Sequence, residues 1–507
     1  MRLSLILLLL CQALPAQQQA RRPAEAPKMQ APAAAPIAAE VDETPAVTHH
    51  EIRLGDKTLR YTATAAQMPL FSPTGEVEAH IFYIAYTLDG VTDISKRPLT
   101  FAFNGGPGSA SMWVHMGAMG PRSPKLLDNG DMPAPPFKIV DNQDTWLDQT
   151  DLVFIDPVGT GYSRAKTVEI ARRMNGVQGD LASVGEFIRM YLQRNQRWLS
   201  PLYIAGESYG TTRAAGLAGY LIDRGIAFNG ITLISTVLNF QTIRPSLMNG
   251  LSYALHLPTY TADAWYHKKL PADLQKDLTS TLKQARTFAI TEYLDALNKG
   301  DNLTPAERKA IVAKISRFTG LEPRYVDYSD LRFDVAHFTR ELLRDRMLTI
   351  GRLDGRLTGP QSRDMGERSE FDPSSTLPLP PFQAAFLTYV RSELNYKTDM
   401  NYYVSGGIMP WDWGSQNNFV DTGIMLRNAF AKNPHLKVMV CAGYFDLATP
   451  FFGAEYTFDH MGLSPEMRRN VSFQYYTAGH MMYIDKESHD KLKRDITEFI
   501  HNTMPEQ

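Results

Sequence analysis

Hydrophobic positions in the first half of the chain fall into short runs that alternate with amphipathic stretches. Residues 177–195 and 211–222 repeat apolar residues at helical spacing, whereas short apolar runs bounded by turn residues predict strands. The predicted strands lie at residues 78–88, 98–103, 151–157, 201–206 and 230–239. Strands and helices alternating at this length predict an α/β fold, with a mostly parallel central sheet flanked by helices on both faces.

The alternation stops after residue 240, and charged side chains at helical spacing dominate the chain until about residue 410. Thr304, Pro305 and Glu307 predict one helix start, as N-cap, first-turn proline and capping-box acid. A Ser/Pro-rich segment at 363–382 interrupts this helical region. We therefore expect a mainly helical cap insertion at residues 241–410.

The sheet pattern resumes behind the insertion. Residues 436–443 and 471–480 predict two further strands, and an amphipathic pattern predicts a last helix at 486–502. Two core segments, 48–240 and 411–507, would thus form one α/β domain around the insertion. The chain contains no internal repeat.

The N-terminus has the features of an export signal. Residues 1–16 combine an early arginine, an apolar run too short to span a bilayer and small residues at the end. Residues 17–47, rich in Ala, Pro and Gln, predict a disordered linker. A lipoprotein would carry small residues before Cys11, but leucines stand there, and only Cys441 remains after cleavage, which allows no intramolecular disulfide. We expect an exported protein, periplasmic or secreted, with no stable membrane anchor after cleavage.

Composition excludes several classes of function. Of 507 residues, 44% are hydrophobic and 21% charged, as in ordinary soluble proteins, and the formal net charge of −2 provides no basic field for nucleic acid. No His, Cys, Asp or Glu cluster has metal-ligand spacing, and no phosphate-binding loop occurs. We expect no metal, no cofactor and no nucleic-acid partner, and the sequence leaves the oligomeric state open.

The stretch YIAGESYG places Ser208 between a predicted strand and a predicted helix. A serine between glycines at such a turn is pushed out at the carboxyl end of the sheet, as in α/β hydrolases. The helix that follows points its N-terminus at the same place and favours negative charge there. A glycine turn with an ordinary N-cap serine is the alternative interpretation.

A serine hydroxyl needs a base to remove its proton and an acid to orient that base. In α/β hydrolases both follow the serine, on loops after later strands. His480 follows a late strand in TAGHMM, and Asp446 is the first carboxylate after the strand before it, in CAGYFDLATP. The order Ser208, Asp446, His480 therefore predicts a catalytic triad, although a structural histidine and a capping aspartate are open alternatives.

Acyl transfer also requires two donors for an oxyanion. In this fold one is the N–H of the residue after the nucleophile, here Tyr209, and the other lies in a loop after an earlier strand. The glycines of TFAFNGGPGSA let the backbone approach a substrate closely. We expect the Gly106 N–H to face the Tyr209 N–H, although NGG alone is equally typical of an ordinary turn.

Five ordered motifs together resemble the serine carboxypeptidase family of α/β hydrolases, over roughly residues 50–240 and 410–505. The motifs are FNGGPGSASMW, DLVFIDPVGTGYS, YIAGESYG, CAGYFD and AGHMM. The resemblance implies removal of C-terminal residues from peptides, and it assigns Ser208 as nucleophile, His480 as base and Asp446 as orienting acid. The family also includes relatives that transfer acyl groups from esters.

The resemblance further implies that Asn104 and Glu207 bind the terminal carboxylate of the substrate. Glu207 can do so only when protonated, because a carboxylate donates no hydrogen bond and repels a second carboxylate. That requirement favours acidic pH and conflicts with His480, which must be neutral to act as a base. The chain departs from the family pattern at a tryptophan, a glutamate and a cysteine, which Ala102, Ala118 and Ser109 replace, so much of the carboxylate-binding network is missing.

These observations predict a serine-type carboxypeptidase that acts on peptide substrates through an acyl-enzyme. An esterase or acyltransferase with the same triad is the first alternative, distinguished by activity on amides and simple esters. A non-catalytic exported binding protein on a hydrolase scaffold is the second, distinguished by failure to react with a fluorophosphonate probe.

Overall fold

The computed structural model describes residues 41–363 and 365–504. The predicted signal peptide and most of the predicted linker lie outside the described residues. The last two residues of that linker belong to a strand, because β1 begins at Ala46. Among the described residues, no helix is both long and apolar enough to cross a membrane.

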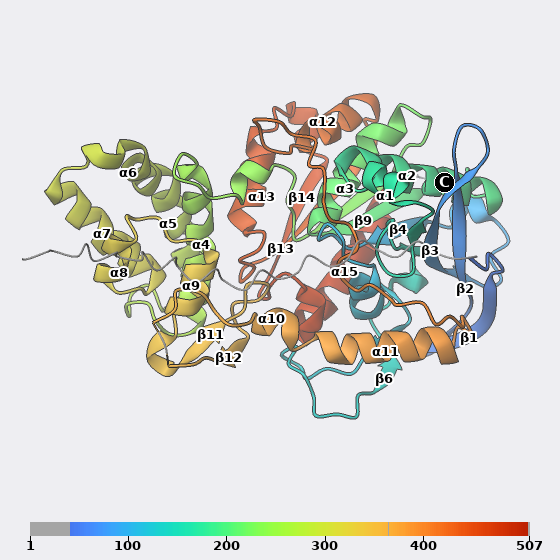
Figure 1. Cartoon of the computed structure of the whole chain (residues 1–507), viewed down its shortest axis with the longest axis horizontal. Coiled ribbons are helices and arrows are strands. Elements are labelled where there is room, and N and C mark those ends of the chain that lie inside the picture. The colour runs from blue at the N-terminus through green and yellow to red at the C-terminus, as the bar shows by residue number, and fades with distance from the viewer. Residues whose placement is uncertain (1–40, 364, 505–507) are drawn as a thin grey trace, which may run out of the picture.

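A ten-stranded sheet runs from the middle of the structure, at β13 and β14, to the right side of Figure 1, at β1 and β2. The strand order is β1-β2-β3-β7-β4-β9-β10-β13-β14, and β8 pairs with β3. The first four strands in this order are antiparallel neighbours, and every pair from β7 onward is parallel. The sheet strands are β1 (Ala46–Leu54), β2 (Lys57–Phe71), β3 (Val77–Leu88), β4 (Leu99–Phe103), β7 (Asp151–Ile155), β8 (Arg164–Ala165), β9 (Leu202–Glu207), β10 (Gly230–Ile234), β13 (Lys437–Gly443) and β14 (Val471–Tyr476).

Helices cover both faces of this sheet, as the pattern predicts. Successive residues of a strand point to opposite faces, so Phe101 and Phe103 join one buried cluster while Ala102 joins the other. Helices α2, α3, α12 and α13 pack in the first cluster, and α11 and α15 pack in the second. Their bounds are α2 (Val177–Arg194), α3 (Tyr209–Ile222), α11 (Leu379–Ser392), α12 (Gly423–Lys432), α13 (Phe451–His460) and α15 (Lys486–Thr503).

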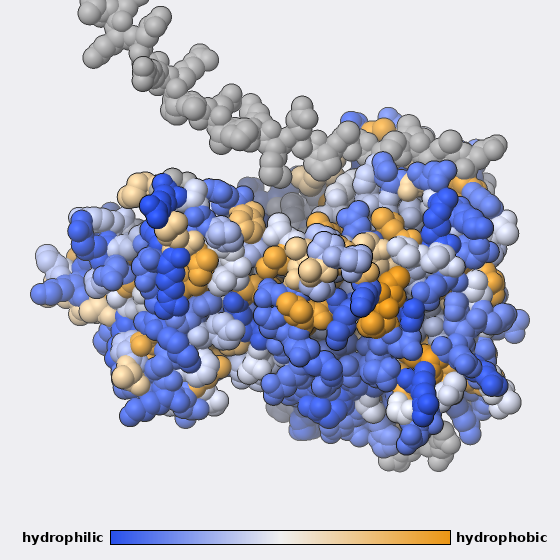
Figure 2. Space-filling view, turned by 90° about the horizontal axis from the view of Figure 1, so that it is seen from below, coloured by the Kyte–Doolittle hydropathy of each residue, from blue (hydrophilic) through white to orange (hydrophobic). Residues whose placement is uncertain are grey.

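Most of the insertion forms a lobe at the left of Figures 1 and 2, around a buried cluster that it shares with core residues such as Phe445 and Phe451. The face of the molecule in Figure 2 is mostly hydrophilic, with apolar residues gathered near its middle. One prediction for this lobe is confirmed in detail, since Thr304 and Glu307 form a reciprocal capping box at the start of α7. The lobe contains α4 (Gly250–Tyr266), α5 (Leu278–Phe288), α6 (Leu294–Lys299), α7 (Pro305–Thr319), α8 (Pro323–Tyr328), α9 (Val335–Glu341), β11 (Leu348–Ile350) and β12 (Thr358–Pro360).

Two sequence predictions require correction. The Ser/Pro-rich segment 363–382 contains helix α10 (Pro373–Thr376) and the start of α11, because its prolines occupy first turns, where a missing N–H costs nothing. The predicted strand 230–239 ends at Ile234, because Ser235 takes a left-handed φ of 55°. The remaining α-helices and strands are α1 (Val168–Met174), α14 (Pro465–Arg468), β5 (Arg122–Pro124) and β6 (Ile139–Asp141).

Candidate active site

Ser208 occupies a strained turn between β9 and α3. Its backbone angles, φ 60° and ψ −129°, lie in a region that residues with a side chain rarely adopt and that costs about 1–3 kcal/mol. The turn is tight, since a Cβ at Gly206 would lie 2.1 Å from the carbonyl oxygen of Gly210. The Ser208 N–H donates to the Ile234 carbonyl over 2.9 Å. The side chain is half-buried and lines a pocket.

Asp446 and His480 meet at the carboxyl ends of β13 and β14. The His480 Nδ1 lies 2.7 Å from the Asp446 Oδ2, and the Asp446 side chain is fully buried. The other oxygen, Oδ1, accepts the N–H groups of Ala448 and Thr449 over 2.8 and 3.1 Å. The acid is therefore held by the turn that follows it, with Oδ2 directed at the imidazole.

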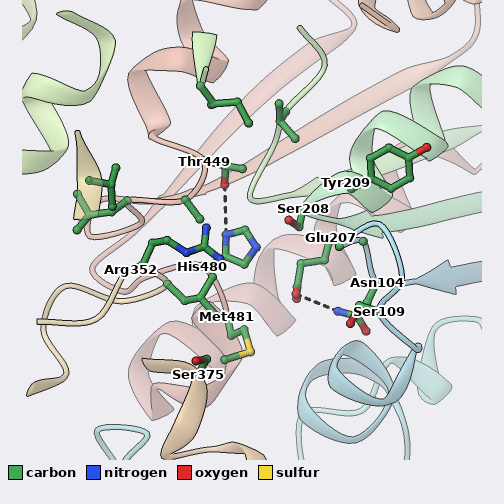
Figure 3. A pocket seen from close by; sticks show the side chains of 18 of the residues that line it. Asn104, Ser109, Glu207, Ser208, Tyr209, Arg352, Ser375, Thr449, His480 and Met481 are labelled. Carbon is green, nitrogen blue, oxygen red and sulfur yellow. Dashed lines mark hydrogen bonds between the residues drawn. The ribbon is translucent and has the colours of Figure 1, made fainter. Parts of the chain in front are cut away.

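The imidazole of His480 and the hydroxyl of Ser208 line the same pocket (Figure 3). Figure 3 shows the Ser208 side chain beside the ring, on the side of the nitrogen that does not contact Thr449. No hydrogen bond joins the two side chains in the described part of the chain, so a proton transfer from Ser208 requires the two groups to approach each other. Burial lowers the pKa of His480, but the carboxylates of Asp446 and Glu207 outweigh burial and raise that pKa above its ordinary value.

The two predicted oxyanion donors belong to neighbouring turns. The N–H groups of Gly106 and Tyr209 donate to no other protein group in the described chain, and both residues line the pocket. Gly105 explains how closely the turns approach each other, because a Cβ there would lie 2.3 Å from the Tyr209 nitrogen. Two free amide donors beside Ser208 are the arrangement that a tetrahedral oxyanion needs.

Asn104 and Glu207, also predicted as site residues, are in direct contact. The Asn104 Nδ2 donates to the Glu207 Oε1 over 2.9 Å, and the Asn104 Oδ1 accepts the Val114 N–H over 3.0 Å. Both side chains are buried and line the pocket. Burial raises the pKa of Glu207 to about 7, against the opposing effects of His480, Tyr483 and Asn104. The carboxyl group therefore changes charge near neutral pH.

The pocket that joins these residues has a volume of about 830 Å³. Its charged side chains are Glu207, Arg244, Asp334 and Arg352, besides the titratable His256 and His480. Much of the remaining wall is apolar or aromatic, including Trp113, Phe240, Ile243, Tyr260, Leu379 and Met481. A pocket of this size and character accommodates a small molecule or the last few residues of a peptide.

Sequence reasoning missed two residues that hold the base. The Thr449 hydroxyl donates to the Asp446 Oδ2 over 2.6 Å and lies 3.2 Å from the His480 Nδ1. The Ser235 hydroxyl donates to the His480 carbonyl over 2.6 Å. Thr449 follows Asp446 by three residues, a spacing typical of a local side-chain turn, which could have indicated it. Ser235 carries no comparable signal.

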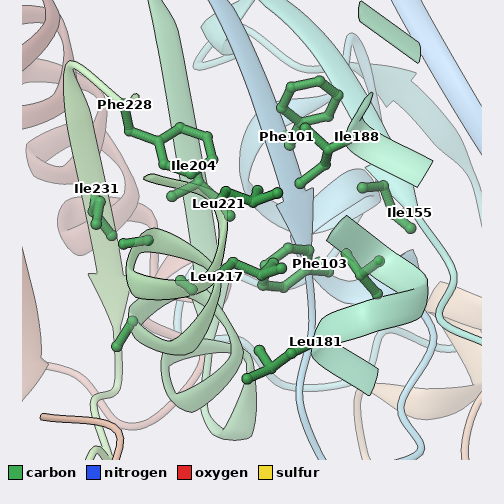
Figure 4. Close-up of a cluster of buried hydrophobic side chains, with 14 of the residues drawn as sticks. Phe101, Phe103, Ile155, Leu181, Ile188, Ile204, Leu217, Leu221, Phe228 and Ile231 are labelled. Carbon is green, nitrogen blue, oxygen red and sulfur yellow. The ribbon is translucent and has the colours of Figure 1, made fainter. Parts of the chain in front are cut away.

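The nucleophile turn rests on a rigid support (Figure 4). Leu217 and Leu221 of α3 belong to the same buried cluster as Ile204 of β9 and Ile231 of β10. Interiors packed in this way resist displacement of side chains and backbone. The position of Ser208 is therefore set by the sheet.

In the described residues, no group of three or more His, Cys, Asp or Glu side chains could hold a metal ion. Cys441 is buried in β13, and burial raises the pKa of its thiol to about 12, which disfavours a role as a second nucleophile.

The sequence profile of serine carboxypeptidases matches residues 71–492, which include every site residue named above. The chain belongs to the serine carboxypeptidase family. A pheromone-processing carboxypeptidase KEX1 of Yarrowia lipolytica is 31% identical over 154 residues, 26% of this chain and 22% of the relative. A retinoid-inducible serine carboxypeptidase of Mus musculus is 28% identical over 146 residues, 28% of this chain and 29% of the relative. The matches thus span less than a third of these family members.

A solved structure shares the fold over a much larger part of the chain. The prohormone-processing carboxypeptidase KEX1ΔP of Saccharomyces cerevisiae superimposes with a TM-score of 0.55 and 16% identity, covering 87% of this chain and 91% of that one. This similarity confirms the predicted α/β-hydrolase fold of this serine carboxypeptidase family member.

Proposed function

We propose that this chain is an exported serine-type carboxypeptidase that hydrolyses C-terminal peptide bonds through an acyl-enzyme. The observation that carries the proposal is the His480–Asp446 pair at 2.7 Å, because its histidine lines one pocket with Ser208 and with the Asn104–Glu207 pair. Family membership and relatives named for processing a pheromone favour a peptide substrate.

The proposed reaction has two steps. His480 removes the proton of Ser208 while the Ser208 oxygen attacks the carbonyl of the last peptide bond, and Asp446 stabilises the imidazolium that forms. The N–H groups of Gly106 and Tyr209 bind the oxyanion, and His480 protonates the leaving amine. Water activated by His480 then attacks the acyl-enzyme and regenerates Ser208.

Chain-end selectivity would come from the Asn104–Glu207 pair. The Glu207 carboxyl, with a pKa of about 7, donates a hydrogen bond to the substrate carboxylate only while it is protonated. His480 must be neutral to act, and its pKa is raised above the ordinary value. The two requirements overlap best in a narrow range near neutral pH.

A fluorophosphonate probe and a Ser208→Ala variant test the chemistry. The wild-type protein should be labelled at Ser208, and the variant should lose labelling and more than about a thousandfold of its hydrolytic activity. A folded wild-type protein that resists the probe would instead indicate a non-catalytic binding protein.

An esterase or acyltransferase with the same triad is the second candidate. The observation that favours it is Ala118, which is fully buried and places a methyl group where the family pattern has a glutamate. The two hypotheses are distinguished by the rates at which the protein cleaves three kinds of substrate: blocked dipeptides with a free C-terminal carboxylate, the amides of these dipeptides, and simple esters. Faster cleavage of the free acid than of its amide supports a carboxypeptidase, whereas equal rates on both support the esterase.

A further inference from the structure

A short loop of the insertion contacts the loop that carries His480. The loop spans residues 352–356, between β11 and β12, and we name it the clamp loop. The His480 N–H donates to the carbonyl of Leu353 over 2.6 Å, and the Gly479 N–H donates to the Asp354 Oδ2 over 3.1 Å. The backbone on both sides of the Gly479–His480 peptide bond is thus fixed by the insertion.

The same loop contacts the loop that carries Asp446. The Leu447 N–H donates to the Arg352 carbonyl over 3.1 Å, and the Gly355 N–H donates to the Phe445 carbonyl over 3.0 Å. The clamp loop therefore joins the proposed acid and the proposed base through four hydrogen bonds, although its own residues lie about 90 to 130 positions earlier in the chain.

Asp354 is itself held by a buried ion pair. Arg356 donates to it from Nη2 over 2.7 Å and from Nε over 3.0 Å. The Nη1 of Arg356 donates to the Thr477 carbonyl over 2.6 Å and to the Asp485 Oδ2 over 3.0 Å. Asp354 is only 3% exposed, so its carboxylate exchanges few contacts with water. Its orientation toward Gly479 is therefore fixed from two sides.

The fit between the two loops leaves no spare volume. A Cβ at Gly479 would lie 2.4 Å from the Leu353 carbonyl oxygen and 2.5 Å from the Asp354 Cβ. Behind the clamp loop, a Cβ at Gly355 would lie 2.1 Å from the Asp263 Oδ1 of α4. Asp263 is fully buried, its pKa is raised well above the ordinary value by burial, and neither of its oxygens has a hydrogen-bond partner. Helix α4 thus places the buried Asp263 carboxyl group against the back of the loop.

We propose that Asp354 is a positioning residue for the reaction, and that the clamp loop is the element through which the insertion holds the base in line with Ser208. The inference rests on the proposed function of His480. Asp354 touches no reacting atom, and it acts by fixing the peptide bond before the imidazole. Small displacements of a catalytic group have large effects on rate, which makes this positioning measurable.

The test uses the full chain and the second-order rate of fluorophosphonate labelling, which depends on Ser208 and His480 but not on peptide specificity. Asp354→Ala should reduce this rate roughly tenfold to a hundredfold. For a cleaved substrate, kcat should fall with KM nearly unchanged, and the acid limb of the pH profile should stay in place. Asp354→Asn keeps an oxygen that accepts the Gly479 N–H and should retain a clearly faster rate than Asp354→Ala.

A matched control separates positioning from loss of stability. Asp151 is a buried carboxylate paired with Arg97 at 2.9 Å and Arg197 at 2.6 Å, at the start of β7 and so at the opposite end of the sheet strands. Asp151→Asn should lower the melting temperature and leave the labelling rate of the folded protein unchanged.

Two results would overturn the inference. One is an Asp354→Ala protein that is folded and labelled at the wild-type rate, and the other is an Asp354→Asn protein that is no faster than Asp354→Ala. A wild-type protein that is not labelled at all contradicts the proposed function instead, so the two failures are distinguishable.

Discussion

The side-chain amide of Asn104 donates a hydrogen bond to the carboxyl group of Glu207 in the pocket that contains Ser208 and His480. Glu207 can donate a hydrogen bond to a substrate carboxylate only if it is protonated, because an ionised carboxylate accepts hydrogen bonds and donates none. Since the pKa of Glu207 is about 7, ordinary changes of pH decide whether this pair attracts or repels a substrate carboxylate.

Glu207→Gln should remove the pH dependence of chain-end selectivity. In the wild-type protein, the ratio of kcat/KM for a blocked dipeptide acid to that for its amide should fall as pH rises through about 7. An uncharged glutamine donates at every pH, so the variant should show a constant ratio. Steady-state kinetics between pH 5 and pH 9, about two units either side of that pKa, measure this ratio. If the ratio in the variant still falls with pH as it does in the wild-type protein, Glu207 has no role in recognition of the carboxylate.

The same substitution should also change the pH dependence of stability. Burial raises the pKa of Glu207 from 4.5 to about 7 in the folded protein, so the folded state holds a proton that the unfolded state has lost in that range. The free energy of unfolding therefore falls as pH rises across this window. The difference in melting temperature between Glu207→Gln and the wild-type protein should therefore increase in favour of the variant as the pH rises from 5 to 8, a range that includes the folded-state pKa of about 7. Parallel curves for the two proteins would contradict the assignment.

Thr449→Val should slow the chemical step. The valine keeps the shape of the side chain but loses the hydroxyl that donates to Asp446 and contacts His480. A hydrogen bond to a charged group is worth about 1.5–3 kcal/mol, so kcat should fall about tenfold or more. Thr449→Ser keeps the hydroxyl and should remain close to wild type, and equal losses in both variants would point to packing as the cause.

Gly105→Ala should disrupt the proposed oxyanion site. The added methyl group would lie 2.3 Å from the Tyr209 nitrogen, so one of the two turns must move. Displacing one donor should slow fluorophosphonate labelling by about a hundredfold or more. Gly453→Ala in α13 is the control, since its nearest neighbours lie at 3.5 Å and alanine favours a helix. An active Gly105→Ala enzyme would argue against this geometry.

Arg352→Gln should move the acid limb of the pH–activity profile. The positive charge of Arg352 lowers the pKa of His480, so its removal should raise that pKa and shift the limb of kcat/KM to higher pH. Activity at pH 6 should then fall relative to activity at pH 8. Arg244 also lines the pocket, but the charges with the largest effects on the His480 pKa are those of Asp446, Glu207 and Arg352, so Arg244→Gln should shift the limb less than Arg352→Gln.

Local patterns were sufficient to predict the central strands of the sheet and the order of the proposed site residues, but they did not predict the edge strands β1 and β2. The runs that end at Phe103, Glu207, Gly443 and Tyr476 form strands because apolar side chains can be buried on both faces there. Their parallel arrangement brings the following loops to one edge. The pairs Asp446–His480 and Asn104–Glu207 follow from that topology, and both are in contact in the structure.

Long-range contacts could not be predicted in the same way. Residues 352–356 have no strong local motif, and their importance arises only when the insertion folds back onto loops about 90 to 130 positions away. The prolines of residues 373–381 led to the prediction of an interruption in the helical region, because a proline inside a helix breaks it. A proline in the first turn is instead compatible with a helix, and α10 and α11 both begin in this way. The pKa of Glu207 depends on burial, which a sequence does not state.

Gly105 lies close to Tyr209, so the two proposed oxyanion donors and Ser208 belong to one part of the polypeptide. The proposed base His480 is held in part by another, the insertion. The nucleophile and both proposed amide donors lie in turns that follow the neighbouring strands β4 and β9, whereas the proposed base is also held by residues 352–356 of the insertion. A chain that lacks residues 352–356 would keep Ser208 and the proposed oxyanion donors Gly106 and Tyr209. It would lose the hydrogen bonds that hold the loop of the proposed base, His480. On this proposal, changes in the cap that admit new substrates would have to preserve the contacts of residues 352–356 with the loop that carries His480.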